Sequence, residues 1–150
     1  SAITELANHY LYGINVPQDE DKGLRYYERA AEYNDAEAFY RLGNYWLVKK
    51  ASTKENREKG AALLEKAAAQ GHQAAIVRLV QFYRGKFGDE LQYEKAAQLM
   101  QRAIIIPDID AQIPYMLGEA YALGEGVPKD EVKAFEMYDR APSSIIEMLS

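Results

Sequence analysis

The chain contains 150 residues with 18 basic and 23 acidic side chains, which gives a formal net charge of −5. The two signs are interspersed, which argues against nucleic acid and anionic membrane surfaces as partners, because both require concentrated lysine and arginine. The absence of cysteine excludes disulfides and thiolate chemistry, and no apolar run reaches the roughly 18 residues of a membrane-spanning helix.

The first predicted element is a helix over residues 2–12. Leu6 and Tyr10 are one helical turn apart, so they form an apolar stripe on one face. Gly13 is suited to the left-handed conformation that ends many helices. The acidic residues 19–21 then mark the start of a second helix, where negative charge complements the helix dipole.

The same pair of elements recurs three more times along the chain. The later stripes pair Leu42 with Trp46, Leu79 with Tyr83 and Leu117 with Tyr121. In three of the first helices, a small residue beside the leucine, as at Gly43 and Gly118, lets a partner helix approach closely, whereas the third has Val80 there. Each second helix follows the same order of residue types: lysine, a small residue, two variable residues, two large residues, a polar residue, a basic residue and alanine. Its lysines are Lys22, Lys59, Lys95 and Lys133, spaced 36 to 38 residues apart. A period of this size is typical of stacked repeats.

Residues between the helices support this division. The sequence Ser52-Thr53-Lys54-Glu55 predicts a capping box for the second helix of the second repeat. Gly71 is a good helix terminator, and Pro114 is tolerated only in the first turn of the next helix. Ser143 and Ser144 are candidates to cap a short helical tail over residues 145–149.

These patterns predict an all-α fold, a right-handed α/α superhelical solenoid of four antiparallel helix pairs. A helix pair cannot bury its aromatic stripe alone, so neighbouring pairs must stack. The expected repeats span about residues 2–34, 35–71, 72–110 and 111–142, followed by the tail 143–150, in one array over residues 1–150. Since the chain opens inside a repeat, we expect it to be a fragment of a longer array or close to one. A periplasmic or secreted location and a cytoplasmic location both fit the sequence.

Three further segments are distinctive: the loop 124–130 with its Gly-x-Gly-Val order, the Ala-Ala-Ala-Gln-Gly-His segment 67–72, and residues 30–38. They resemble the Sel1-like repeat (SLR) family, which is related to the tetratricopeptide repeat. The sequence departs from the family pattern at residues 49–52, which replace the glycine loop, and at Val80, which replaces a glycine. The resemblance implies a helical scaffold or adaptor that binds a protein or peptide, usually in bacteria. It implies no enzymatic activity and no cofactor.

Candidate catalytic and metal-binding groups are sparse. Asp108 and Asp110 are close in sequence and fit a carboxylate pair for acid–base catalysis, but beside Pro107 and before a helix they fit capping better. His9 and His72 are too isolated to predict a zinc site, and both fit structural roles. We therefore predict no catalytic residue and no metal site.

Helical geometry predicts a set of partner-binding residues on the concave face. In each first helix, the polar residue two places after the stripe leucine is expected to point away from the partner helix, flanked by the residue two places before that leucine. With one added arginine, the set is Thr4, Asn8, Tyr40, Asn44, Val77, Gln81, Arg84, Tyr115 and Glu119. Amides pair with the main chain of an extended peptide and rings cover its apolar side chains. The same positions also fit a solvated surface without a partner.

Three functions from different classes follow from these observations. The first is a noncatalytic protein-interaction scaffold that binds a protein or peptide partner. The second is a structural array that spaces other domains of a longer chain. The third is a small hydrolase that uses Asp108, Asp110 and a tyrosine, which requires a pocket where the two carboxylates converge.

Overall fold

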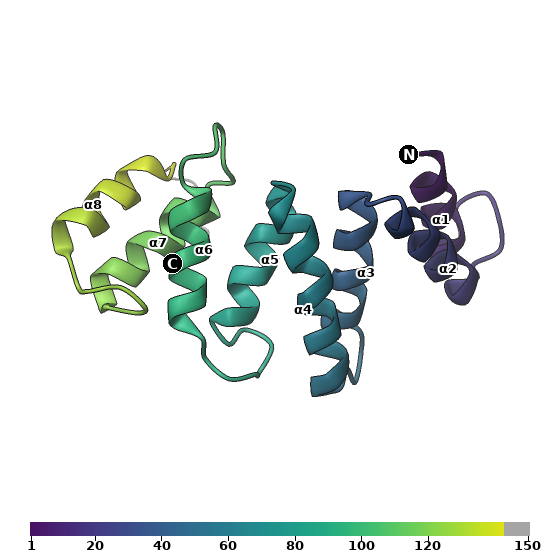
Figure 1. Ribbon diagram of the computed structural model, residues 1–150, viewed down its shortest axis with the longest axis horizontal. Helices are drawn as coiled ribbons and strands as arrows, with labels where there is room; N and C mark the ends of the chain where they lie inside the picture. The colour runs from purple at the N-terminus through teal and green to yellow at the C-terminus, as the bar shows by residue number, and fades with distance from the viewer. Residues whose placement is uncertain (143–150) are drawn as a thin grey trace. The chain divides into compact units, whose positions relative to one another are not determined.

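The computed structural model describes residues 1–142, and in that part of the chain the regular secondary structure is α-helical. This confirms the predicted all-α fold class. The helices, shown in Figure 1, are α1 (Ala2–Tyr12), α2 (Glu20–Glu32), α3 (Ala36–Val48), α4 (Lys54–Ala69), α5 (Gln73–Tyr83), α6 (Tyr93–Ala103), α7 (Gln112–Leu123) and α8 (Glu131–Arg140). The predicted tail 143–150 lies outside the described residues.

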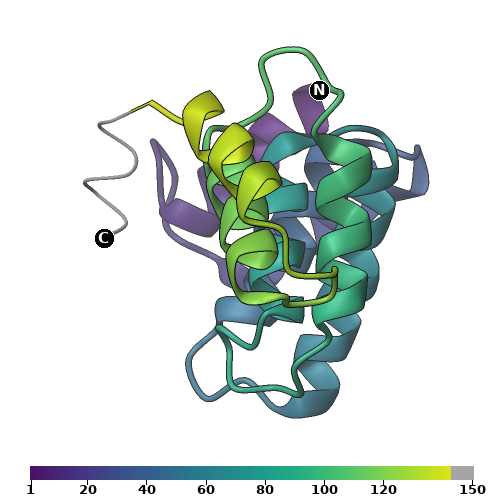
Figure 2. The ribbon, with the colours of Figure 1, turned by 90° about the vertical axis from the view of Figure 1, so that its left-hand side faces the viewer.

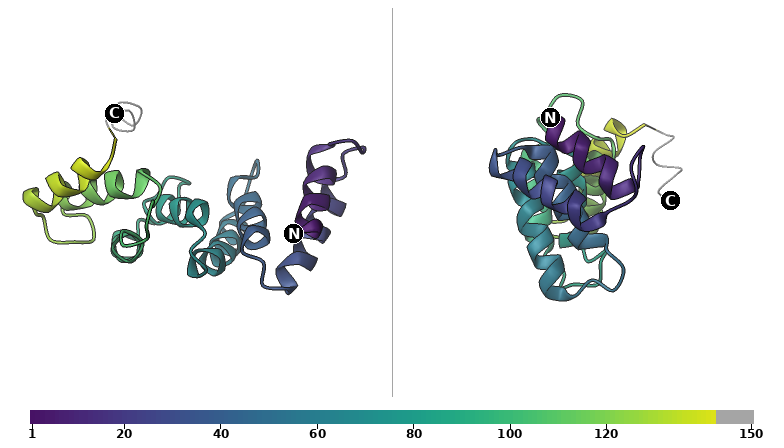
Figure 3. Two further views of the ribbon diagram at one scale, coloured as in Figure 1. Left: turned by 90° about the horizontal axis from the view of Figure 1, so that it is seen from above. Right: turned by 90° about the vertical axis from the view of Figure 1, so that its right-hand side faces the viewer.

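The contacts between helices divide the chain into two compact units, which meet in sequence within α5. The first unit covers Ser1–Ala75 and the second begins at Ile76. In the first unit α1 packs against α2, α2 against α3, and α3 against α4. In the second unit α6 packs against α7 and α7 against α8 (Figures 2 and 3). The helices named in these pairs therefore pack against their neighbours in sequence.

Side-chain caps explain where several helices begin. The carboxylates of Asp19, Asp35 and Asp130 accept hydrogen bonds from backbone N–H groups three residues ahead, at 3.0–3.1 Å. Such a cap satisfies one of the donors left free in the first turn of a helix. The predicted capping box is wrong by one residue, since Thr53 is the cap of α4 and accepts from the Asn56 N–H at 3.1 Å. The Ser52 hydroxyl instead donates to the carbonyl of Trp46 at 2.6 Å.

The predicted stop and start signals of two further helices are confirmed. Gly13 ends α1 with φ of 67°, in the left-handed region. Pro114 is the third residue of α7, within its first turn, where no intrahelical N–H bond is lost.

The tightest helix contact in the first unit lies between Gly43 of α3 and Gly60 of α4. A Cβ atom added to Gly60 would lie 2.6 Å from the carbonyl oxygen of Gly43. A Cβ atom on Gly43 would in turn lie 2.8 Å from the carbonyl oxygen of Gly60. Because both obstacles are backbone atoms, only glycine permits this approach, as the small residue beside Leu42 predicts.

Candidate functional site

A pocket of about 300 Å³ opens in the second unit beside α5, the start of α6 and α7. Its lining consists of Gln81, Arg84, Lys86, Tyr93, Gln112, Tyr115, Met116 and Glu119. Four of these, Gln81, Arg84, Tyr115 and Glu119, belong to the predicted contact set. The repeat spacing thus brings side chains that are up to 38 residues apart in sequence to one hollow.

Arg84 is the charged centre of this pocket. Its Nη1 atom lies 3.3 Å from Oε1 of Glu119, and its Nη2 atom lies 3.6 Å from Oε1 of Glu125. The Tyr93 hydroxyl is hydrogen-bonded to Glu125, and this bond, together with burial, raises the pKa of Tyr93. The Arg84 guanidinium is thus shared between two carboxylates, and the lining also contains a second cation, Lys86.

Neutral polar and apolar groups surround that charge. Gln81 accepts a hydrogen bond from Nη1 of Arg78 at 3.3 Å through its Oε1 atom, while its NH₂ group supplies two further donors. The Tyr115 ring lies 5.6 Å from the ring of Tyr138, which fixes one of its sides. Met116 adds a flexible apolar surface beside it. Chemically, this arrangement suits main-chain amides and an uncharged side chain.

A second cluster of predicted residues lies in the first unit. The rings of Tyr40 and His72 stack with centroids 4.7 Å apart. Nε2 of His72 lies 2.7 Å from Oε2 of Glu37, and Nε of Arg41 lies 2.7 Å from Oε1 of the same carboxylate. The Oδ1 atom of nearby Asn44 in α3 is buried and makes no hydrogen bond within the described chain.

The remaining predicted residues take other positions. Thr4 and Val77 are buried, so they present little surface to a partner. The Asn8 side chain faces α2, opposite to the expected direction, since its Oδ1 atom accepts a hydrogen bond from the Tyr27 hydroxyl. The two histidines make structural contacts: Nδ1 of His72 accepts from the Ala75 N–H at 3.2 Å, and Nδ1 of His9 lies 3.0 Å from the carbonyl of Ile14.

Four lining residues of the pocket, Lys86, Tyr93, Gln112 and Met116, are not in the predicted set. Lys86 lies in the loop after α5, between two glycines with positive φ, Gly85 and Gly88, and Tyr93 is the first residue of α6 after that loop. Gln112 lies at the first position of α7. The loop glycines were a local signal for Lys86 and Tyr93, whereas Gln112 and Met116 are positions of α7 that the predicted contact set did not include.

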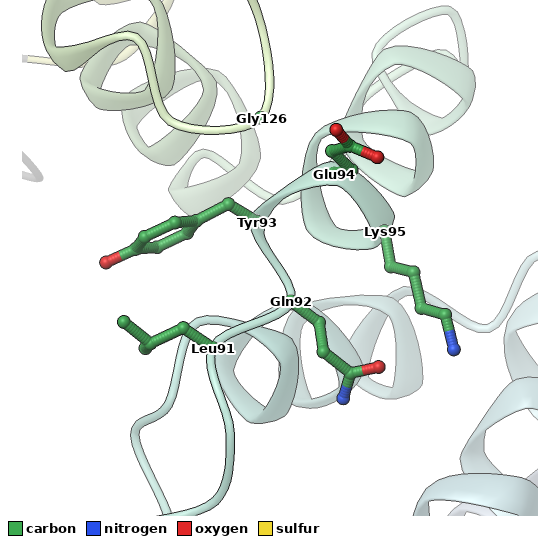
Figure 4. Close-up of a pocket in the computed structure, with 6 residues that line it drawn as sticks. All are labelled: Leu91, Gln92, Tyr93, Glu94, Lys95 and Gly126. Atoms are coloured by element: carbon green, nitrogen blue, oxygen red, sulfur yellow. The ribbon is translucent and has the colours of Figure 1, made fainter.

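A shallower hollow of about 450 Å³ lies at the start of α6, as Figure 4 shows. The side chains of Leu91 and Tyr93 extend to one side of the backbone, and Lys95 extends to the other. The loop before α8 crosses here so closely that a Cβ atom on Gly126 would lie 2.1 Å from the carbonyl oxygen of Tyr93. Gly126 has φ of 78°, which also favours glycine. The glycine loop thus has a packing role at this point.

Neither aspartate of the pair proposed for a hydrolase is the N-cap of α7, which is Ala111 and has no side-chain cap, so the expected capping role is wrong in detail. Oδ1 of Asp110 accepts from the N–H of Gln112 at 2.9 Å, and Asp108 is exposed with φ of 55°. Neither residue lines the two pockets described above.

Within residues 1–142 there is no cluster of three or more metal-ligating side chains. The helices of that part are also too short or too polar to cross a membrane.

Comparison with known sequences identifies the family. The Sel1 repeat matches residues 1–35, 36–72, 82–104 and 115–141, which together make up most of the chain. The chain therefore belongs to the Sel1 repeat family. No curated protein gives a match.

Solved structures with this repeat have the same fold. One is a protective antigen of uropathogenic Escherichia coli that displays an SLR fold, with a TM-score of 0.77 and 25% identity over 93% of this chain and 29% of that one. Another is a Sel1 repeat protein from Oxalobacter formigenes, with a TM-score of 0.77 and 27% identity over 93% of this chain and 56% of that one. The chain thus spans about a third to a half of the length of these proteins.

Proposed function

We propose that this chain is a noncatalytic protein-interaction module, and that the pocket beside α5, α6 and α7 binds an extended segment of a partner protein. The observation that carries the proposal is the convergence of Gln81, Tyr115 and Glu119 on one pocket. All three occupy the repeat positions at which the sequence predicts partner contacts. Membership of a repeat family whose members act in protein–protein interaction supports the same function.

The chemistry of the lining favours main-chain recognition. The amides of Gln81 and Gln112 each offer a donor and an acceptor, the combination that a peptide bond requires. Tyr115 and Met116 provide an apolar surface for one partner side chain. Arg84 and Glu119 pair with each other, so these two charges do not by themselves select a charged partner residue.

A displayed library of random linear peptides tests this proposal, with affinities of the selected peptides then measured by calorimetry. We expect Tyr115→Ala to weaken binding about tenfold or more, the loss typical of a central aromatic contact. Gln81→Ala is expected to weaken binding as well. Tyr33→Ala is the matched control, because Tyr33 is an exposed tyrosine of the first unit. Unchanged affinity of the Tyr115→Ala protein would remove the pocket from the proposal.

The first-unit cluster provides a second arm of the same experiment. Tyr40→Ala and Asn44→Ala remove the predicted contacts of that unit and leave the pocket intact. A loss confined to these two variants would keep the interaction function and move the contact site to the first unit. Failure of the library to yield any peptide with measurable affinity would count against peptide binding as such.

A further inference from the structure

A hollow of about 230 Å³ in the first unit is lined by four residues of α2, namely Lys22, Arg25, Tyr26 and Arg29. Lys22, Arg25 and Arg29 are separated by three and four residues along the helix, so they lie on one face. The half-buried ring of Tyr26 stacks on the ring of Tyr10 in α1, with centroids 5.7 Å apart. The four lining residues form the basic face of α2.

Two cations of the basic face have no counter-charge of their own. Arg25 and Arg29 are exposed, and within residues 1–142 neither makes an ion pair, although α2 also contains acidic side chains. Like charges one turn apart destabilise a helix, so this pair of arginines contributes unfavourably to the stability of α2. A negatively charged ligand relieves that repulsion and supplies the missing counter-charge.

Repetition explains part of the basic face but not its middle residue. All four second helices have a lysine at the position of Lys22 and a basic residue at the position of Arg29. Each of those lysines lies over an aromatic ring of its partner helix, 4.5–5.7 Å from the centroid, which is a packing role. At the position of Arg25 the other second helices have Ala62, Gln98 and Glu136. Among the described helices, the row of three cations is therefore particular to α2.

The positions of these three cations stay exposed where another helix pair precedes them. α1 and α2 precede α4 in the first unit, and the residues of α4 at the three positions are all exposed: Lys59, Ala62 and Lys66. The position of Tyr26 differs, because its counterpart Leu63 is half-buried against a cluster of α1, α2 and α3. The three cations, rather than the ring, are therefore the groups that a partner can reach.

We propose that the basic face of α2 binds an acidic segment of a partner protein, an extended stretch in which two aspartate or glutamate side chains point the same way. The row from Lys22 to Arg29 is about 10 Å long along the helix axis. Side chains on one side of an extended chain recur about every 7 Å, so two neighbouring carboxylates match the length of the row. Arg25 and Arg29 each offer paired N–H donors to a carboxylate. A single phosphate matches the row less well, because it meets the row at one point.

This contact belongs to the first unit and stands whether or not the α5–α7 pocket binds a peptide. Fluorescence anisotropy with a labelled peptide of six glutamates, titrated at low salt, tests it. We expect saturable binding that weakens as the salt concentration rises, because salt screens exposed charges. Arg25→Gln and Arg29→Gln should each weaken binding about two- to fivefold, the range of an exposed ion pair, and the double variant about tenfold. Arg25→Lys keeps the charge and should retain most of the affinity.

Lys50→Gln is the matched control, because it removes one positive charge from an exposed residue outside α2, and it should bind as the wild type does. Equal losses in Lys50→Gln and Arg25→Gln would overturn the proposal, since they would reflect net charge alone. The absence of saturable binding to hexaglutamate would also overturn it, and binding to phosphatidylserine vesicles in that case would assign the face to a membrane surface. Inorganic phosphate that binds as tightly as hexaglutamate would replace the acidic segment with a single anion.

Discussion

The imidazole of His72 is joined to the carboxylate of Glu37 by a hydrogen bond of 2.7 Å between Nε2 and Oε2. Both residues belong to the repeat matched at residues 36–72, one near its start and one at its end, so the bond joins the two ends of that repeat within the first unit. The other oxygen of Glu37 accepts from Arg41 on the same helix, one turn further on. Both oxygens of this carboxylate are therefore engaged, one by each partner.

Glu37→Gln is expected to make the free energy of unfolding change less as the pH falls into the acidic range. Burial acts to raise the pKa of Glu37, but the hydrogen bonds from His72 and Arg41 outweigh it and lower the pKa below the ordinary 4.5. The folded state then holds its proton less tightly than the unfolded state, so the stabilisation is present above pH 4.5 and is lost as pH falls through the folded pKa.

Thermal unfolding at a series of pH values measures this effect. Because Glu37 is partly exposed, we expect a loss of about 0.5 kcal/mol or less at neutral pH, shrinking toward zero in acid. Glu58→Gln is the control, since Glu58 is exposed and lies 3.9 Å from Lys54. An effect of Glu37→Gln that stays constant from neutral to acidic pH would contradict the prediction.

Tyr27→Phe is expected to destabilise the first unit by about 1 kcal/mol, the usual net value of a lost hydrogen bond. Tyr27 is fully buried, and its hydroxyl donates to Oδ1 of Asn8. A double-mutant cycle with Asn8→Ala, followed by urea unfolding, isolates the pairwise contribution. Additive effects of the two substitutions would show that the contact contributes nothing measurable.

Alkaline titration provides an independent test of tyrosine burial. Burial raises the pKa of Tyr27 to about 12, and burial with a hydrogen bond to Glu20 raises the pKa of Tyr45 to about 12. Between pH 10 and 12 the folded protein retains these protons while the unfolded chain releases them. The free energy of unfolding therefore falls as pH rises through this range. Tyrosinate absorbance followed against pH should show one fewer tyrosine titrating near pH 12 in Tyr27→Phe, and likewise in Tyr45→Phe. A titration curve that is unchanged in both variants would be inconsistent with these contacts.

Gly60→Ala is expected to destabilise the protein by about 1–3 kcal/mol through overpacking, although alanine favours helices by about 1 kcal/mol. The added Cβ atom meets the Gly43 carbonyl, which cannot move without shifting α3. Ala62→Gly is the control at an exposed position of the same helix, and it should cost about 1 kcal/mol through helix propensity alone. A Gly60→Ala protein that is more stable than the wild type in urea would show that the helices are not in close contact.

Arg84→Met is expected to destabilise the second unit by about 1–3 kcal/mol, because it leaves Glu119 and Glu125 without their shared cation. Lys86→Met changes an exposed cation of the same pocket and should stay within about 0.5 kcal/mol of the wild type. Urea unfolding compares the two variants. Equal, small effects of both substitutions would mean that the Arg84 ion pairs do not stabilise the fold.

Repetition made the helix pairs predictable from the sequence, because the stripe leucines and repeat lysines recur at a nearly constant spacing. The close contact at Gly43 was predictable for the same reason. The direction of a side chain could not be predicted from the repeat pattern, because it depends on local partners. Asn8 turns toward the Tyr27 hydroxyl, while Gln81 lines the pocket. The contribution of Tyr93 was also hidden, since it depends on the path of a loop that the repeat pattern does not specify.

The most direct test of partner binding at the α5–α7 pocket is nuclear magnetic resonance of the isotopically labelled chain, titrated with a peptide selected from the displayed library. We predict that the largest chemical-shift changes occur at Gln81, Tyr115 and Glu119, and that Tyr115→Ala abolishes them. Saturable shift changes that leave these three residues unaffected would contradict the account.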